Sequence, residues 1–307
     1  LHIPDGFLNL VISLIFWAAT IIMVGLAISK TNKTLGEKQI PLMGVMAAFI
    51  FAAQMLNFPV AGGTSGHFLG GALAAIVLGP WAGILVMTAV IAVQGLLFQD
   101  GGLLVMGANI FNMGILTAVI GFGLYRMVGG AKKGLRLTIA GAAAWLATMA
   151  AALLTALQLW LSGTSRLEIV LPAMLGVHIL IGVGEALITV AALAFIERTR
   201  PDLLNAEKTA ASGGRGWIMA GILVTFLAVM ISPLASGSPD GLERVAENLG
   251  FLADGKAASY QILPDYTIPF LGETALSTIF AGVIGALILM GLLVLLGRSL
   301  RRAGSRE

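Results

Sequence analysis

The chain contains no cysteine and only three histidines, His2, His67 and His178, among its 307 residues. The absence of cysteine excludes disulfides, thiolate metal ligands and cysteine nucleophiles. Charged residues are scarce, at 11% against about 25% in soluble domains. Hydrophobic residues reach 58%, more than a soluble globule can bury, so a membrane is the expected solvent. The small net charge of +3 argues against a nucleic-acid-binding protein.

Long runs with little or no charge are what the sequence has in abundance. About 20 helical residues cross the hydrocarbon core, and such runs occupy 8–29, 41–57, 70–97, 104–125, 137–161, 169–196, 217–233 and 275–297. The run 70–97 contains Gly79-Pro80, and proline disfavours helix at the residue before it. We therefore expect two elements there, a short one at about 70–79 and a fuller one at about 81–97. The first run lacks a preceding basic segment and a convincing cleavage site, so we expect it to be retained.

Basic residues are concentrated in four segments that alternate with these runs. The positive-inside rule places all four segments in the cytoplasm, which requires an odd number of crossings between 58 and 125. The N-terminus is then outside and the C-terminus inside. The four segments hold Lys30, Lys33 and Lys38; Arg126, Lys132, Lys133 and Arg136; Arg198, Arg200, Lys208 and Arg215; and Arg298, Arg301, Arg302 and Arg306.

The distribution of charge also divides the chain into modules. Residues 234–274 form an acidic external loop, and the charged segment 197–216 contains Ser212-Gly213-Gly214, which is typical of a linker. We therefore expect an all-α polytopic membrane protein with a seven-element helical core at 1–200 and a cytoplasmic linker at 201–216. Residues 217–307 then form a two-span hairpin that carries a small extracytoplasmic loop module.

Several polar side chains interrupt the apolar runs. Glu185 is the only carboxylate deep inside one, and His178, seven residues earlier, projects from nearly the same helix face. Because a charge at the bilayer centre costs about 2.5–3.5 kcal/mol, we expect these two either to lock helix packing through hydrogen bonds or to lie on a substrate path. Amides in apolar helices are usually interhelical hydrogen-bond partners, and less often contact a ligand. The amides of this kind are Gln54, Asn57, Asn109 and Asn112.

The first residues, Leu1-His2-Ile3-Pro4-Asp5-Gly6, place a histidine at position two. The α-amine of Leu1, the deprotonated amide nitrogen of His2 and the ring Nδ1 of His2 can form fused five- and six-membered chelate rings in one plane. A square-planar set of nitrogen ligands suits Ni(II) and Cu(II). One corner of that square remains open.

His67 is the natural fourth ligand. It ends the uncharged, glycine-rich stretch 60–67, which is external by the topology above and leads into the short element 70–79. Irregular backbone enters a membrane protein only where protein or water surrounds it, and a re-entrant loop meets that condition. The alternative is that the histidine at position two is there by chance and binds no metal, and that His67 is an ordinary loop residue.

At these residues the sequence resembles the CbiM/NikM substrate-binding subunits of energy-coupling-factor transporters for cobalt and nickel. The resemblance covers about 1–200. It is carried by the opening His-Ile-Pro-Asp-Gly-Phe, by residues 62–67 with Gly79-Pro80-Trp81 after them, and by His178 with Glu185. Residues 239–243, Pro-Asp-Gly-Leu-Glu, are similar to the PDGLE signature of the companion CbiN/NikN subunits, here fused to the core.

The resemblance implies that Leu1, His2 and His67 hold a Ni²⁺ or Co²⁺ ion as transported substrate, with nickel favoured because of the fused companion module. It implies that Asn57, His178 and Glu185 are structural or pathway residues near the site. The family begins with Met, whereas this sequence begins with Leu1. We expect a non-standard start codon, translated literally, to account for the difference, and the chelate uses main-chain nitrogen and not the side chain of residue 1.

The sequence contains no G-x-x-x-x-G-K-[ST] run, so we expect no ATP to bind this chain. The implied partners are a CbiQ/NikQ-type transmembrane coupling subunit and CbiO/NikO-type ATPases, in the cytoplasmic membrane of a bacterium or archaeon. Two other functions remain open. The first is an intramembrane serine protease, with a dyad formed by His178 and by Ser65 of Gly63-Thr64-Ser65-Gly66. The second is an autonomous metal channel or secondary transporter.

Overall fold

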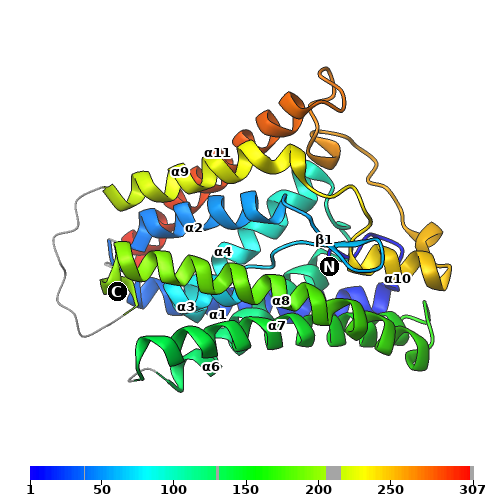
Figure 1. Ribbon diagram of the computed structural model, residues 1–307, viewed down its shortest axis with the longest axis horizontal. Helices are drawn as coiled ribbons and strands as arrows, with labels where there is room; N and C mark the ends of the chain where they lie inside the picture. The colour runs from blue at the N-terminus through cyan, green and yellow to red at the C-terminus, as the bar shows by residue number, and fades with distance from the viewer. Residues whose placement is uncertain (38, 129–130, 205–215, 305–307) are drawn as a thin grey trace.

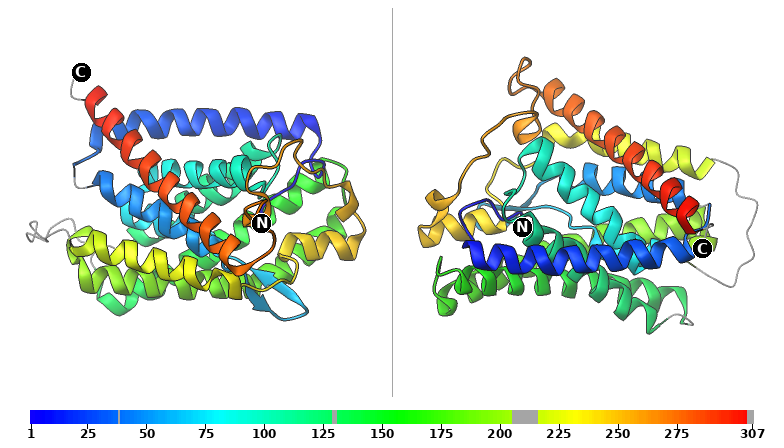
Figure 2. Two further views of the ribbon diagram at one scale, coloured as in Figure 1. Left: turned by 90° about the horizontal axis from the view of Figure 1, so that it is seen from above. Right: turned by 180° about the vertical axis from the view of Figure 1, so that it is seen from behind.

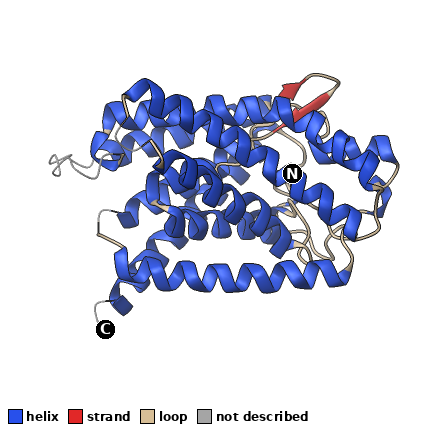
Figure 3. Ribbon diagram, turned by 90° about the horizontal axis from the view of Figure 1, so that it is seen from below, coloured by secondary structure: helices blue, strands red, loops and turns tan. Residues whose placement is uncertain are grey.

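The computed structural model describes residues 1–37, 39–128, 131–204 and 216–304, and these residues are mostly helical (Figure 1). A single two-stranded antiparallel hairpin, drawn in red in Figure 3, interrupts the helices of the described chain. The helices of the first module are α1 (Leu10–Thr34), α2 (Gln39–Gln54), α3 (Gly71–Leu78), α4 (Pro80–Val93), α5 (Met106–Asn109), α6 (Thr117–Arg126), α7 (Lys133–Leu161) and α8 (Leu167–Thr199). The second module contributes α9 (Gly216–Ile231), α10 (Gly241–Leu249) and α11 (Ala275–Gly304).

Within the described residues, seven helical segments are long and apolar enough to cross a membrane, and α2 and α3 are shorter apolar helices. The nine expected elements are therefore all present. The break expected at Gly79-Pro80 is confirmed: Gly79 has a φ of +83°, which ends α3, and Pro80 starts α4 at the position where its missing N–H costs nothing. The second run was expected to stay helical to 57, but α2 ends at Gln54 and the chain turns into strand β1 (Phe58–Val60).

The two modules pack into one bundle. Helices α9 and α11 lie beside α2, as the right-hand view of Figure 2 shows, while α7 and α8 pair along the opposite side of the bundle (Figure 1). Gly285 of α11 allows this closeness, because a methyl group at that position would overlap the ring of Phe51 on α2. The second module is therefore part of the core packing.

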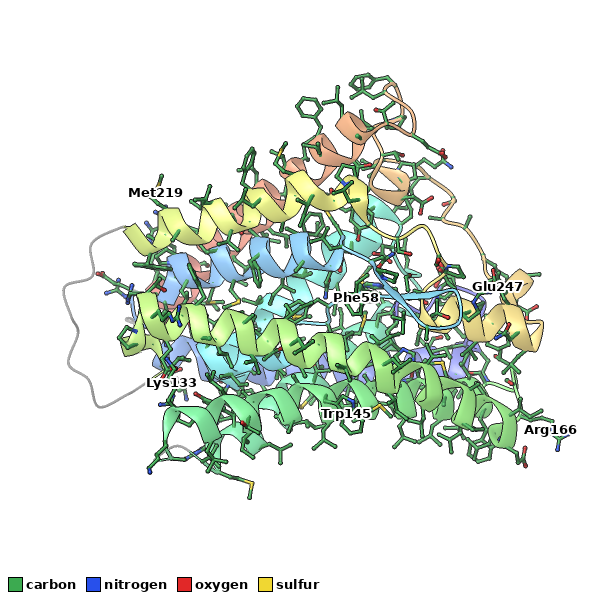
Figure 4. All side chains as sticks on the ribbon, viewed as in Figure 1. Phe58, Lys133, Trp145, Arg166, Met219 and Glu247 are labelled. Atoms are coloured by element: carbon green, nitrogen blue, oxygen red, sulfur yellow. The ribbon has the colours of Figure 1, made fainter. Side chains whose placement is uncertain are left out.

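The described basic segments gather at one end of the bundle, and the N-terminal residue lies towards the other. Figure 4 shows Lys133 at one end and Arg166 with Glu247 at the other. An ion pair between Arg301 and Glu37 joins the first and last basic segments, and one of 3.2 Å between Lys133 and Glu197 joins the middle two. Lys38, Lys208, Arg215, Arg306 and most of the linker expected at 201–216 lie outside the described residues.

Candidate metal centre

The N-terminal segment is held in place by hydrogen bonds to α5 and to the residues just before it. The side chain of Asn109 accepts from Ile3 N (2.8 Å) and donates to Ile3 O (3.0 Å). The carboxylate of Asp5 accepts three main-chain N–H groups of residues 103–105, just before α5. Gly6 has a φ of +97°, and a side chain there would overlap the carbonyl of Asp254. The opening motif thus serves to fix the position of residues 1 and 2.

The loop that carries His67 is equally constrained. Strand β2 (Thr64–Gly66) pairs with β1, and the loop then runs to α3. Glu185 on α8 accepts Leu69 N–H (2.6 Å) and Gly70 N–H (3.0 Å), and Gln54 donates to Leu69 O (2.7 Å). Of the two interpretations of Glu185, the structure supports the structural one, since both carboxylate oxygens accept hydrogen bonds from this loop.

These two segments bring the predicted ligands together. The main-chain nitrogen of Leu1 lies 2.9 Å from His67 Nε2, and the rings of His2 and His67 stack with centroids 5.1 Å apart. Leu1, His2 and His67 are 4%, 9% and 7% exposed, so the cluster is closed to bulk water. Within the described chain no three His, Asp or Glu side chains form a metal site by themselves. A metal at this cluster therefore needs main-chain nitrogen as well.

Asp240 also belongs to this cluster, although it was identified from the sequence only as part of the PDGLE motif. Its Oδ2 lies 2.7 Å from Leu1 N and 3.9 Å from His67 Nε2. Its Oδ1 accepts the N–H groups of Leu242 and Glu243, so the same side chain caps the N-terminus of α10. The PDGLE motif therefore delivers a carboxylate to the predicted metal ligands.

Asp100 is a second carboxylate that sequence reasoning missed. It follows the apolar run that ends near 97, and its Oδ1 lies 3.1 Å from His2 Nδ1. Tyr266 donates to its Oδ2 at 2.5 Å. The only signal in the sequence was its place at the external end of a span, next to Gly101-Gly102.

Burial controls the protonation of the cluster. It lowers the pKa of both His2 and His67 to about 3, and the nearby charge on the Leu1 nitrogen acts in the same direction. Burial alone would raise the pKa of Asp240. The positive charge on the Leu1 nitrogen, followed by the interaction with His67, outweighs this effect of burial and holds that pKa well below its ordinary value. Burial raises the pKa of Asp100. The imidazoles are therefore neutral near pH 7, the form that binds metal.

Of the remaining candidate residues, His178 lies at the cluster and Asn57 contacts the external loop. His178 on α8 lies 2.7 Å, through Nδ1, from Met174 O one turn earlier, and it lines a small cavity together with Leu1, His67 and Asp240. The carbonyl of Asn57 accepts the N–H of Ser236 at 2.7 Å, where the external loop begins.

The geometry around Ser65 does not form a protease dyad. Its hydroxyl donates to Ser238 O at 2.7 Å and its main-chain N–H donates to Pro239 O at 2.9 Å. Ser65 is fully buried, and among the described residues these bonds join β2 to the PDGLE segment instead of to a histidine. The dyad with His178 is therefore wrong.

Comparison with known proteins agrees with this arrangement of modules. Residues 2–203 match the CbiM family, described as the cobalt uptake substrate-specific transmembrane region, and residues 215–302 match the PDGLE domain. The chain belongs to the CbiM family. The family match includes His2 and His67, and the PDGLE match includes Asp240 and Tyr266.

Relatives over the full length are fused proteins of the same kind. A putative fused nickel transport protein NikMN of Archaeoglobus fulgidus is 37% identical over 99% of this chain and 100% of its own length. The fused nickel transport protein NikMN of Rhodobacter capsulatus is 30% identical over 99% and 100%. A crystal structure of a truncated transition metal transporter shares 33% identity and a TM-score of 0.59 over 64% of this chain and 99% of its own. The CbiM-family chain is thus a multi-pass membrane protein of metal transport.

Proposed function

We propose that the chain is the substrate-binding subunit of an ATP-driven energy-coupling-factor importer for Ni²⁺ or Co²⁺, with nickel favoured. The ion is held by the amine of Leu1, the main-chain nitrogen and Nδ1 of His2, and Nε2 of His67. The observation that carries this proposal is the 2.9 Å distance between Leu1 N and His67 Nε2. Two nitrogens bound at right angles, each about 2.0 Å from one ion, are about 2.8 Å apart.

The donor set also supports the choice of metal. All four proposed donors are nitrogens, and a nitrogen square favours Ni(II) over Co(II). The two imidazoles are neutral and closed to water, so no proton has to leave them before metal binds. Asp100 Oδ1 contacts His2 Nδ1 at 3.1 Å, so His2 exchanges this contact for the ion when Nδ1 binds it.

The import reaction requires partners that this chain does not supply. The sequence lacks a P-loop, so ATP is hydrolysed by CbiO/NikO-type subunits that act through a CbiQ/NikQ-type coupling subunit. The gathering of the described basic segments at one end supports an orientation with that end, and the C-terminus, in the cytoplasm. The metal cluster and the PDGLE module then face the outside, where the ion is captured.

Calorimetric titration of the purified chain with Ni²⁺ tests the proposal. His67→Ala is expected to abolish tight binding, because it removes one of four ligands. His178→Ala, which changes a histidine outside the proposed ligand set, serves as the matched control and is expected to retain binding. Comparable Ni²⁺ affinity in His67→Ala and the unaltered chain would refute the ligand set, and binding of neither Ni²⁺ nor Co²⁺ by the unaltered chain would refute the function.

A further inference from the structure

The external module also reaches the candidate metal centre at a second point, through Tyr266 and not through Asp240. Tyr266 lies in this module and its hydroxyl donates to Asp100 Oδ2 at 2.5 Å. The same hydroxyl accepts from Gln94 Nε2 at 3.1 Å. Asp100 Oδ1 in turn lies 3.1 Å from His2 Nδ1. One phenol therefore holds two side chains of the core, and one of these contacts the ligand His2 directly.

The backbone around this phenol is in a costly conformation. In the described chain, three residues other than glycine have a positive φ: Gln99 (57°), Asp265 (48°) and Tyr266 (57°). All three are members or immediate neighbours of this network. The segment Gln94–Phe98 is also a π-helix, a rare form that is frequent at functional sites. Strain of this kind persists only where surrounding contacts enforce it, and it clusters at ligand sites.

Two buried polar atoms in the network have no hydrogen-bond partner among the residues that the structure describes. They are Nε2 of His2 and Oε1 of Gln94. Gln94 is fully buried, and because its Nε2 donates to Tyr266, its Oε1 is the atom left to accept a hydrogen bond. A histidine that binds metal through one ring nitrogen usually donates the N–H of the other to such an acceptor. The unpaired atoms thus match what His2 needs once Nδ1 carries an ion.

We propose that Tyr266 is a positioning residue for the metal ligand His2, acting through Asp100 and Gln94. Asp100 contacts the Nδ1 side of the ring. Gln94, oriented by the phenol, accepts from Nε2 when the ion occupies Nδ1. The PDGLE module therefore sets the orientation of a ligand that belongs to the CbiM module. This inference rests on the proposed function, because it assigns Tyr266 a role only if His2 binds metal.

The test compares two tyrosines of the same loop in the full chain. Tyr266→Phe removes the hydroxyl but keeps the ring, which stacks on Phe98 with centroids 4.8 Å apart. Tyr260→Phe is the matched control, because its hydroxyl donates to Leu96 O at 2.8 Å and is not part of the network. Loss of an acceptor that supports a ligating histidine typically lowers metal affinity about 10- to 100-fold. We expect a loss of that size in Tyr266→Phe and unchanged Ni²⁺ affinity in Tyr260→Phe.

Further measurements separate positioning from stability. Combining Tyr266→Phe with Asp100→Asn is expected to weaken Ni²⁺ binding by less than the product of the two single effects. The ¹⁵N shifts of the His2 ring in the Ni²⁺-loaded protein are expected to change in Tyr266→Phe but not in Tyr260→Phe. Gln94→Met disturbs the network from the core side and is expected to lower affinity similarly, so it provides the test if Tyr266→Phe does not fold.

The outcomes distinguish this inference from the function on which it rests. Ni²⁺ affinity equal to that of the unaltered chain in folded Tyr266→Phe, or in Gln94→Met if only that variant folds, would overturn the positioning role alone. Failure of the unaltered chain to bind Ni²⁺ or Co²⁺ would overturn the proposed function.

Discussion

The carboxylate of Asp240 lies 2.7 Å from the main-chain nitrogen of Leu1, although 239 residues separate them in the sequence. The two residues also belong to different modules, since the CbiM match ends at 203 and the PDGLE match begins at 215. The external module is therefore in direct contact with the proposed metal ligands.

Each residue of the PDGLE motif has a physical role in this contact. The carbonyl of Pro239 accepts from Ser65, which aligns the motif with strand β2. Leu242 is fully buried, and Glu243 accepts the main-chain N–H of Asp240 at 2.8 Å, which completes a capping box. Gly241 allows α10 to approach α8. The motif thus holds the carboxylate of Asp240 beside the amine of Leu1.

Asp240→Asn is expected to destabilise the metal-free protein. Asparagine still caps α10, but it leaves the charged amine of Leu1 buried without its counter-ion, which typically costs about 3–5 kcal/mol. Unfolding of the metal-free protein in detergent measures the effect. Asp254→Asn, an exposed carboxylate of the same module, is the control and should be neutral. Equal stability of the Asp240 and Asp254 variants would contradict the role of the ion pair.

Residues added before Leu1 are expected to abolish tight nickel binding without unfolding the protein. The extension converts the amine into an amide, and Leu1 is only 4% exposed, so the added chain also displaces residue 1 from Asp240. The same residues added after residue 307 are the control. Calorimetry that finds the same Ni²⁺ affinity for both extended proteins would rule out the amine as a ligand.

The metal-free protein is expected to lose stability as the pH falls below about 6.5. Burial holds the pKa of His2 and His67 at about 3, whereas histidines of an unfolded chain titrate near 6.5. Below that pH the unfolded state binds more protons, so stability is complete above about 6.5 and falls towards 3. The slope reaches about 1.4 kcal/mol per pH unit for each histidine. The free energy of unfolding at pH 5 and at pH 7.5 measures this loss. His67→Gln should reduce the slope. A free energy of unfolding that does not change with pH over this range would contradict the prediction.

Gly241→Ala is expected to push α10 away from α8. A methyl group at Gly241 would lie 2.8 Å from Ile181 Cδ1 and 2.9 Å from His178 Cε1, closer than carbon atoms pack. We expect a loss of about 1–3 kcal/mol in stability and weaker Ni²⁺ binding, since Asp240 moves with the helix. Gly237→Ala, four residues earlier, meets nothing within 4 Å and is the control. Identical behaviour of the two alanine variants would show that the close contact has no role.

The sequence allowed the spans to be predicted because a membrane demands continuous apolar runs, and Gly79-Pro80 marked the one break within a run. The approach of His2 to His67 followed from topology, since both had to lie on the same side. Asp240, Asp100 and Tyr266 could not be placed, because contacts between distant loops leave no periodic pattern in the sequence. Glu185 was recognised as exceptional, but its partners are main-chain N–H groups, which no sequence motif identifies.

The position of the bound ion tests the account most directly. A crystal of the protein with Leu1 as its first residue, soaked in Ni²⁺ and measured at the nickel absorption edge, shows where the metal lies. The proposed ligand set predicts one anomalous peak about 2 Å from Leu1 N, His2 Nδ1 and His67 Nε2. A peak at the carboxylates of Asp100 and Asp240 with no nitrogen ligand from Leu1, or a peak elsewhere in the bundle, would contradict it.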